Sequence, residues 1–335
     1  MAATMKDVAK LAGTSTATVS KVLNGSYAIS EPTADRVRQA MEELNYHPNA
    51  AARNFAKQST RCVVFLAELG ENTGFSNPHM FEIVRGLEHA LSEKAYSLII
   101  KNIDAAGACA YIEQTMGTKA ADGFVIHASV ISEELDELIY KESIPHLVIG
   151  MPHFTNHFCW IDIDNRLAGE MAARYLFQRG YQALAFVAGE DKDEISRHRL
   201  EGVLSVLQQH DVILPHAYLR NGVSECDSGY QMTKEILKAD RRPDAMICAN
   251  NYIAYGCVLA LRDSGLVIPH DVGVITFDDY PFSQILSPRL TVIGIDVYDV
   301  GVQAGKQMIQ KIRKPNLYIQ SYITMPTLIE RESTI

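Results

Sequence analysis

Residues 5–23 read MKDVAKLAGTSTATVSKVL and predict two short helices that meet at Gly13. Glycine supplies the backbone freedom that a tight turn needs. We expect Ser15 to cap the second helix, because its hydroxyl can accept a hydrogen bond from an amide of the next turn. The first helix has one apolar face at helical spacing, formed by Val8, Ala9, Leu11 and Ala12.

The second helix separates apolar from polar side chains. Its inner face consists of Val19, Val22 and Leu23. Small or polar side chains remain outside, at Thr16, Ala17, Thr18, Ser20 and Lys21. A helix-turn-helix presents such a face to the DNA major groove, with residues near the start of the second helix at the base edges.

The segment MKDVAKLAGTSTATVSKVLNG closely resembles the DNA-binding headpiece of the lactose-repressor (LacI/GalR) family. The resemblance continues through SEPTADRVRQAMEELNYHPNAAARNFAKQS, residues 30–59, and extends more loosely over the whole chain. It implies a sequence-specific DNA-binding transcription regulator, most often a repressor controlled by a small effector. On this basis residues 1–58 form a helix-turn-helix headpiece, and its further DNA-contacting candidates are Lys6, Asn24, Asn49, Ala52, Arg53 and Phe55.

A third helix is expected after Ser30, which can cap it, with Pro32 tolerated in its first turn. Val37, Met41 and Leu44 would face the other two helices. Asn45 can end the helix in a left-handed conformation.

Residues 49–58, NAAARNFAKQ, are too few for a stable isolated helix. The resemblance implies a hinge helix there, which folds when two copies meet in the DNA minor groove. Phe55 stands where the family usually has a leucine that wedges between base pairs, so its geometry in that role stays open. Arg53 is a candidate for a phosphate or the minor groove. A plain linker is the alternative for this segment.

The composition is that of a soluble globular protein, and the charge is unevenly distributed along the chain. The chain has 335 residues, 47% hydrophobic and 21% charged. It lacks an apolar signal segment and the ~18-residue apolar run of a membrane helix, so we expect a cytoplasmic protein. Its six cysteines are scattered and predict neither disulfides nor a zinc site. The net charge is −9, whereas residues 1–58 carry +2, as expected for a small DNA-binding region on an acidic body.

From Arg61 onward, apolar strand segments alternate with amphipathic helices, which predicts parallel α/β structure in two doubly wound halves. This region resembles the family's sugar-binding core, which has a periplasmic-binding-protein-like fold. The resemblance implies a ligand-binding and dimerisation core over 61–335, with three crossings between halves, near Asp162, Thr291 and Thr324. The N-subdomain would comprise 61–161 and 292–323, and the C-subdomain 162–291 and 324–335.

Ligands of doubly wound sheets bind beyond the carboxyl ends of the strands. Arg199, Asn250 and Asp278 follow such ends, and the family's effector-contacting residues fall on these positions. Carboxylate, guanidinium and amide groups suit a polyol. Trp160, the single tryptophan, is a candidate for stacking on a sugar, with core packing as the alternative.

Several departures from the family bear on the effector. Asn251 replaces a frequent aspartate, and Asp193 replaces the arginine of a purine-repressor-like site. The acidic loop at residues 189–194 disfavours a phosphate ligand. The loop at residues 68–78 is unusually long. Histidines 127, 146, 153 and 157 lack metal-ligand spacing and are expected to be solvated or satisfied internally.

We therefore expect a homodimeric, ligand-responsive repressor. Its partners would be operator DNA and a sugar-like effector, and it would need no metal or cofactor. An activator or a nucleoside- or purine-type corepressor remains open. A sugar receptor would need an export signal. An enzyme would need a catalytic motif such as GxSxG, a Walker sequence or GxGxxG, and none occurs. The chain ends after TLIERES without leucine heptads, so we expect no tetramer.

Overall fold

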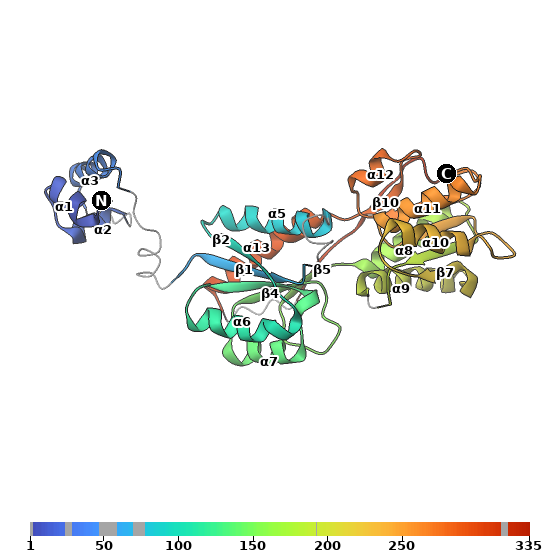
Figure 1. Cartoon of the computed structure of the whole chain (residues 1–335), viewed down its shortest axis with the longest axis horizontal. Coiled ribbons are helices and arrows are strands. Elements are labelled where there is room, and N and C mark those ends of the chain that lie inside the picture. Colours follow the sequence, from blue (N-terminus) through green and yellow to red (C-terminus); the bar gives the residue numbers. More distant parts are fainter. Residues whose placement is uncertain (1–2, 24–28, 47–58, 70–77, 192, 316–320) are drawn as a thin grey trace. The chain divides into compact units, whose positions relative to one another are not determined.

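The structure is a computed structural model of the whole chain, and it describes residues 3–23, 29–46, 59–69, 78–191, 193–315 and 321–335 (Figure 1). The chain forms two compact units. The first unit comprises residues 1–62 and 116–122, and the second comprises 63–115 and 123–335.

The first unit contains a three-helix domain: α1 (Met5–Leu11), α2 (Thr16–Leu23) and α3 (Glu31–Glu43). Gly13 has a φ of 62°, so the predicted glycine turn between α1 and α2 is confirmed. Asn45 has a φ of 46°, as expected for a left-handed residue after α3. The small core consists of Val8, Ala9, Ala12, Val19, Val37 and Ala40.

Two expectations about these helices are wrong. Leu11, the last residue of α1, is 46% exposed and does not belong to the small core, whereas Val8, Ala9 and Ala12 do. Ser30 occupies the N-cap position of α3 but makes no side-chain hydrogen bond to a backbone amide. Its hydroxyl donates instead to the Thr33 hydroxyl at 3.1 Å.

Residues 59–61 are tied to Asp122, which explains why residues 116–122 belong to the first unit. The Asp122 carboxylate accepts from the Thr60 amide at 2.7 Å and from the Thr60 hydroxyl at 2.8 Å. It also accepts from the Arg61 amide at 3.1 Å. These bonds lie just outside the predicted 1–58 headpiece, at the start of the predicted core.

The second unit contains two six-stranded sheets. The first sheet has the order β11-β5-β4-β3-β1-β2. Its strands are β1 (Cys62–Ala67), β2 (Ser97–Asn102), β3 (Gly123–His127), β4 (His146–Ile149), β5 (Trp160–Ile163) and β11 (Ser321–Thr324). The second sheet has the order β12-β10-β9-β8-β6-β7. Its strands are β6 (Leu184–Ala188), β7 (Leu219–Asn221), β8 (Ala245–Cys248), β9 (Gly273–Phe277), β10 (Thr291–Gly294) and β12 (Thr327–Ile329).

Both sheets have the parallel pairing that the buried strand segments predicted, with β12 as an antiparallel edge strand. Strands β1, β4, β6, β8 and β9 are buried along their whole length, as parallel strands covered on both faces must be. The two halves therefore have the doubly wound architecture expected from the alternation of strands and helices.

Helices cover the first sheet on both faces (Figure 1). On one face lie α5 (Pro78–Ser92) and α13 (Val297–Arg313), and on the other α6 (Ala105–Gly117) and α7 (Glu133–Glu142). The second sheet packs against two helix pairs: α8 (Asn165–Gln178) with α9 (Glu194–Gln209), and α10 (Cys226–Ile236) with α11 (Asn251–Asp263). The short helices are η1 (Ala128–Val130), η2 (His216–Tyr218) and α12 (Pro281–Ile285).

The chain passes between the sheets three times, slightly later than expected at the first two crossings. Strand β5 keeps residues 162 and 163 in the first sheet. Strand β10 pairs with β9 and β12, so residues 292–294 lie in the second sheet rather than in the N-subdomain. The third crossing follows Thr324 at the end of β11. The hydrogen-bonded register of each strand, which apolar patterning does not reveal, sets these boundaries.

No helix in the described part of the chain is both long and apolar enough to cross a bilayer.

Candidate functional sites

The helix-turn-helix surface forms as the sequence predicted. The Ser15 hydroxyl accepts a hydrogen bond from the Thr18 amide at 3.1 Å and so caps α2. Thr16, Ala17 and Lys21 are exposed, as is Lys6 on α1, while Thr18 and Ser20 are half-buried. The exposed face of α2 is therefore available to DNA.

One stabilising feature of α1 was missed in the sequence. Thr4 and Asp7 form a capping box, in which the Asp7 carboxylate accepts from the Thr4 amide at 2.9 Å and the Thr4 hydroxyl accepts from the Asp7 amide. Threonine three residues before aspartate is the signal that could have revealed it. The remaining DNA-contacting candidates, Asn24, Asn49, Ala52, Arg53 and Phe55, lie outside the described residues.

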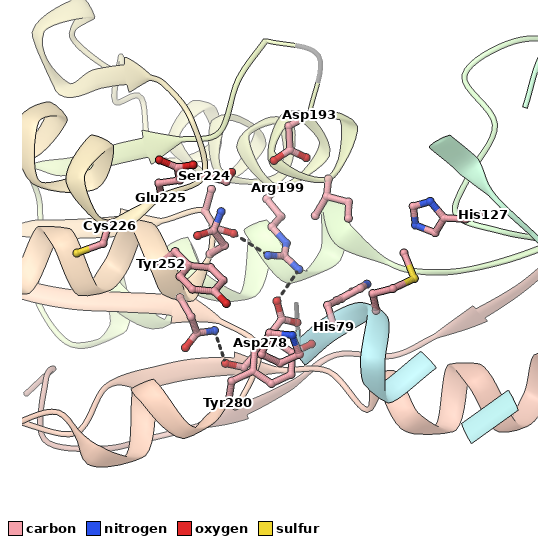
Figure 2. Close-up of a pocket in the computed structure, with 16 residues that line it drawn as sticks. His79, His127, Asp193, Arg199, Ser224, Glu225, Cys226, Tyr252, Asp278 and Tyr280 are labelled. Atoms are coloured by element: carbon pink, nitrogen blue, oxygen red, sulfur yellow. Dashed lines mark hydrogen bonds and ion pairs between the residues drawn. The ribbon is translucent and has the colours of Figure 1, made fainter. Parts of the chain in front are cut away.

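A cavity of about 610 Å³ lies in the second unit. It is lined by side chains beyond the carboxyl ends of β3, β6, β8 and β9 and by the start of α5 (Figure 2). The predicted residues Arg199, Asn250 and Asp278 all line it. Trp160 does not: it lies on β5, half-buried, between Val148 of β4 and Ser321 of β11. Trp160 is the first residue of β5, so it lies at the opposite end of that strand from the carboxyl end, where ligands of doubly wound sheets bind.

Arg199 is only 2% exposed, and protein groups bind its guanidinium on several sides. Its Nη1 donates to the Ala249 carbonyl at 2.7 Å and its Nε to Asn165 at 3.0 Å. Its Nη2 lies 3.5 Å from an Asp278 carboxylate oxygen, and the guanidinium carbon lies 4.3 Å from the Phe277 ring centroid. Burial of an arginine requires such pairing, so Arg199 and Asp278 together form a nearly neutral pair in the cavity wall.

Close packing of α8 and α9 sets the position of Arg199. A Cβ added at Gly169 would lie 1.9 Å from the Arg199 carbonyl oxygen, and one added at Gly202 would lie 2.0 Å from the Arg166 carbonyl oxygen. Both glycines therefore allow a helix contact that no other residue would permit.

Asp278 directly follows β9 and has a left-handed backbone, with φ at 67°. Asparagine and aspartate tolerate this region better than other non-glycine residues. The Asn251 side-chain amide donates to the Phe277 carbonyl at 2.6 Å and to the Asp278 carbonyl at 2.9 Å. The amide of Asn251 therefore has a structural role that the aspartate frequent at this position in the family could not fill, because a carboxylate cannot donate to these carbonyls.

Helix caps orient two more lining residues. The Asn250 side chain accepts from the Ile253 amide at 3.0 Å and begins α11. The Asp193 carboxylate accepts from the Ser196 amide at 3.1 Å and begins α9. With these caps, α11 begins at Asn251 and α9 begins at Glu194.

Three polar atoms of the described lining are buried without a hydrogen-bond partner: Asp278 Oδ1, Asn251 Oδ1 and the Tyr280 hydroxyl. Burial raises the pKa of the Tyr280 phenol, and the Asp278 charge acts in the same direction. Buried polar atoms are nearly always paired. The cavity wall therefore holds unused hydrogen-bonding capacity.

Two histidines line the cavity, and sequence reasoning missed both as site residues. Burial lowers the pKa of the His79 imidazole, although the nearby Asp278 carboxylate opposes the effect. Burial, with His79 as a second cause, lowers the pKa of His127 to about 4. His127 is the last residue of β3, so its place after a strand was the available signal.

The other histidines of the predicted set have internal partners or lie outside the lining. His146 is buried, with Nδ1 2.8 Å from the Ile144 carbonyl and Nε2 accepting from the Cys159 amide at 3.0 Å. His157 bonds the Asp136 carboxylate at 2.8 Å. In the described part of the chain, no three metal-ligating side chains converge.

The fixed charges of the described lining are mostly negative. Asp193, Glu225 and Asp278 supply carboxylates, and Arg199 supplies the cation. Lys192, which precedes Asp193 in the sequence, lies outside the described residues. The described lining offers hydrogen-bond donors and acceptors for a polar ligand.

The helix-turn-helix surface together with a polar cavity in a paired-sheet unit defines a DNA-binding transcriptional regulator. A profile of bacterial regulatory proteins of the lacI family matches residues 4–49, and a periplasmic binding protein-like domain profile matches residues 173–334. The chain is 31% identical to the ribose operon repressor of Escherichia coli (strain K12), covering 99% of both sequences. It is 32% identical to the HTH-type transcriptional repressor PurR of Pectobacterium atrosepticum, covering 99% of this chain and 96% of the relative.

The chain therefore belongs to the lacI family of bacterial regulatory proteins. Its fold is similar to that of a lac repressor dimer bound to operator and the anti-inducer ONPF, with a TM-score of 0.87, 24% identity and complete coverage of both chains. Membership in a family of regulators confirms the expectation that the chain is not an enzyme.

Proposed function

We propose that this protein is a repressor whose operator binding is controlled by a neutral or weakly charged, sugar-like effector in the 610 Å³ cavity. Asp278, Arg199 and Asn250 would bind the effector. The observation that carries the proposal is the set of buried, unpartnered atoms in the lining, namely Asp278 Oδ1, Asn251 Oδ1 and the Tyr280 hydroxyl. A ligand rich in hydroxyl groups can satisfy all three atoms. A relative named for the ribose operon supports the same ligand class.

A purine-type corepressor is the second candidate, because PurR is an equally similar relative. The carboxylates of Asp193 and Glu225 disfavour a phosphorylated form of such a ligand. A neutral nucleoside or nucleobase remains compatible with the described lining.

The proposed mechanism couples the cavity to DNA through the crossing segments. An effector bound between the two sheets would change their separation, and with it the spacing of the two headpieces in a homodimer. Two headpieces on one symmetric operator reinforce each other, so a change in spacing lowers affinity. A ligand that prefers the DNA-binding state would act with the opposite sign. The proposed function implies a cytoplasmic location, because operator DNA lies in the cytoplasm.

The test combines a thermal-shift screen with one variant. Neutral sugars, sugar phosphates, nucleosides and nucleobases are screened, because ligands stabilise the native state by mass action. Asp278→Ala should abolish the ligand-dependent change in operator affinity and leave ligand-free operator binding nearly intact. Asp278→Asn, which tolerates the left-handed backbone, controls for misfolding.

A ligand response that survives in both variants would show that the effector binds elsewhere. A dianionic phosphate as the strongest ligand would also contradict the proposal. Sedimentation at micromolar concentration should show dimers, and a stable tetramer would contradict the predicted assembly.

A further inference from the structure

The ring of His127 has a defined hydrogen-bonding orientation. Its Nδ1 accepts a hydrogen bond from the Ser129 backbone amide at 3.2 Å. The Ser129 hydroxyl lies 2.9 Å from the same nitrogen. That hydroxyl oxygen accepts from the Glu68 amide at 3.2 Å, so its own proton is available to Nδ1. A backbone amide can only donate, and therefore Nδ1 carries no hydrogen.

The remaining ring nitrogen must then carry the hydrogen of the neutral imidazole. The low pKa of about 4 keeps this ring neutral near pH 7. The described residues offer His127 Nε2 no hydrogen-bond partner, and His127 lines the cavity. His146 shows the contrasting case, because backbone groups occupy both of its nitrogens.

Other residues of the described lining have the complementary chemistry. Figure 2 shows His127 apart from Asp278 and Tyr280, on the far side of the cavity from Ser224 and Glu225. Asp278 Oδ1 and Asn251 Oδ1 are buried acceptors without partners. The Asn251 amide nitrogen is already used on two carbonyls, which fixes the other atom as the oxygen.

We propose that His127 is a specificity-determining residue, whose Nε2–H donates to an oxygen lone pair of the effector while Asp278 and Asn251 accept from its hydroxyl groups. This inference rests on the proposed function and refines its ligand class. The effector is a neutral hydroxylated molecule that presents an acceptor oxygen toward β3 and hydroxyl donors toward β9. A ligand with an ammonium group toward His127 would place a donor against a donor and is rejected.

The orientation of the ring can be measured without any ligand. Nitrogen-15 NMR of the ligand-free full chain at pH 7 distinguishes protonated from bare ring nitrogens, and His127→Gln identifies the signal. We expect His127 to have a bare Nδ1 and a protonated Nε2. A protonated Nδ1, or a doubly protonated ring, would overturn the inference.

Binding is then compared in matched variants, with the probe that stabilises the wild type most in a panel of neutral sugars, nucleosides and nucleobases that includes D-ribose. His127→Gln keeps a donor near the Nε2 position and should bind within a few-fold of the wild type. His127→Leu removes the donor and should bind roughly tenfold more weakly. His153→Leu, outside the lining, is the control and should bind as the wild type does.

The outcomes separate this inference from the proposed function. Binding that is lost in Asp278→Ala but unchanged in His127→Leu overturns only the role of His127. Binding that is unchanged in both variants overturns the pocket itself. If no probe stabilises the wild type, the NMR result alone decides the orientation of His127, and a bare Nδ1 supports the inference.

Discussion

The side chain of Asn251 holds the backbone of Asp278 in place. Its amide donates to the Asp278 carbonyl at 2.9 Å and to the preceding Phe277 carbonyl at 2.6 Å, and both side chains are about 95% buried. Asp278 has a left-handed backbone at the end of a central strand, with φ at 67°. Asn251 thereby fixes the direction in which the Asp278 carboxylate enters the cavity.

Replacing this amide should therefore destabilise the second unit. Asn251→Asp removes both donors and places a buried carboxylate against two carbonyls, at a cost of about 1–3 kcal/mol or more. Urea unfolding followed by circular dichroism measures the change. Asn250→Asp is the matched control, because an aspartate can still accept from the Ile253 amide as a helix cap. Equal stability of the two variants would contradict this role for Asn251.

Helix packing behind Arg199 can be tested by a single methyl group. Gly169→Ala would bring a Cβ against the Arg199 carbonyl, so α9 must move and Arg199 with it. We expect a loss of about 1–3 kcal/mol in unfolding free energy, together with weaker effector binding. Gly117→Ala at the end of α6 is the control, since nothing lies within 4 Å of its added Cβ. Indistinguishable melting curves for the two variants would refute this packing argument.

Lys21 should contribute to operator choice, because it is exposed on the outer face of α2. Lys21→Ala should weaken specific binding by ~1–3 kcal/mol if the ammonium contacts a guanine edge. Fluorescence anisotropy on operator and on unrelated DNA, at two salt concentrations, measures the specific and the non-specific affinity. An equal loss on all sequences would instead assign Lys21 to a phosphate. Lys141→Ala, an exposed lysine of α7, should leave both affinities unchanged.

Acid should destabilise the second unit through His146. Burial lowers its folded-state pKa to about 4, below the unfolded value of 6.5. The unfolded chain therefore takes up a proton first as the pH falls, and stability is lost between pH 6.5 and pH 4. The full loss is about 3 kcal/mol for a shift of this size. The neutral ring contributes its whole stabilisation above pH 6.5.

Urea unfolding at several pH values, followed by the fluorescence of Trp160 on β5, measures this slope. His146→Gln should lower stability at pH 7, because His146 bonds two backbone groups, and should flatten the slope below pH 6.5. An unchanged slope in this variant would assign the acid sensitivity to other groups.

The sequence by itself determined the features that depend on neighbours along the chain. The helical pair over residues 5–23, with its cap at Ser15, follows from local spacing and a single glycine. Buried strand segments indicated two parallel sheets. Arg199, Asn250 and Asp278 were assigned to one cavity because the carboxyl ends of parallel strands meet at one edge.

Only the tertiary structure decided features that join residues distant in the chain. Asn251 binds the Asp278 backbone 27 positions away, and Gly169 faces the Arg199 backbone of another helix. The fold also brings His127 into one cavity lining with Asn251 and Asp278, which are more than 120 positions away. Trp160 does not line the cavity, because it is the first residue of β5 and lies away from the carboxyl end of that strand. Strand register and side-chain direction arise from packing among distant elements, and no local pattern of residues encodes them.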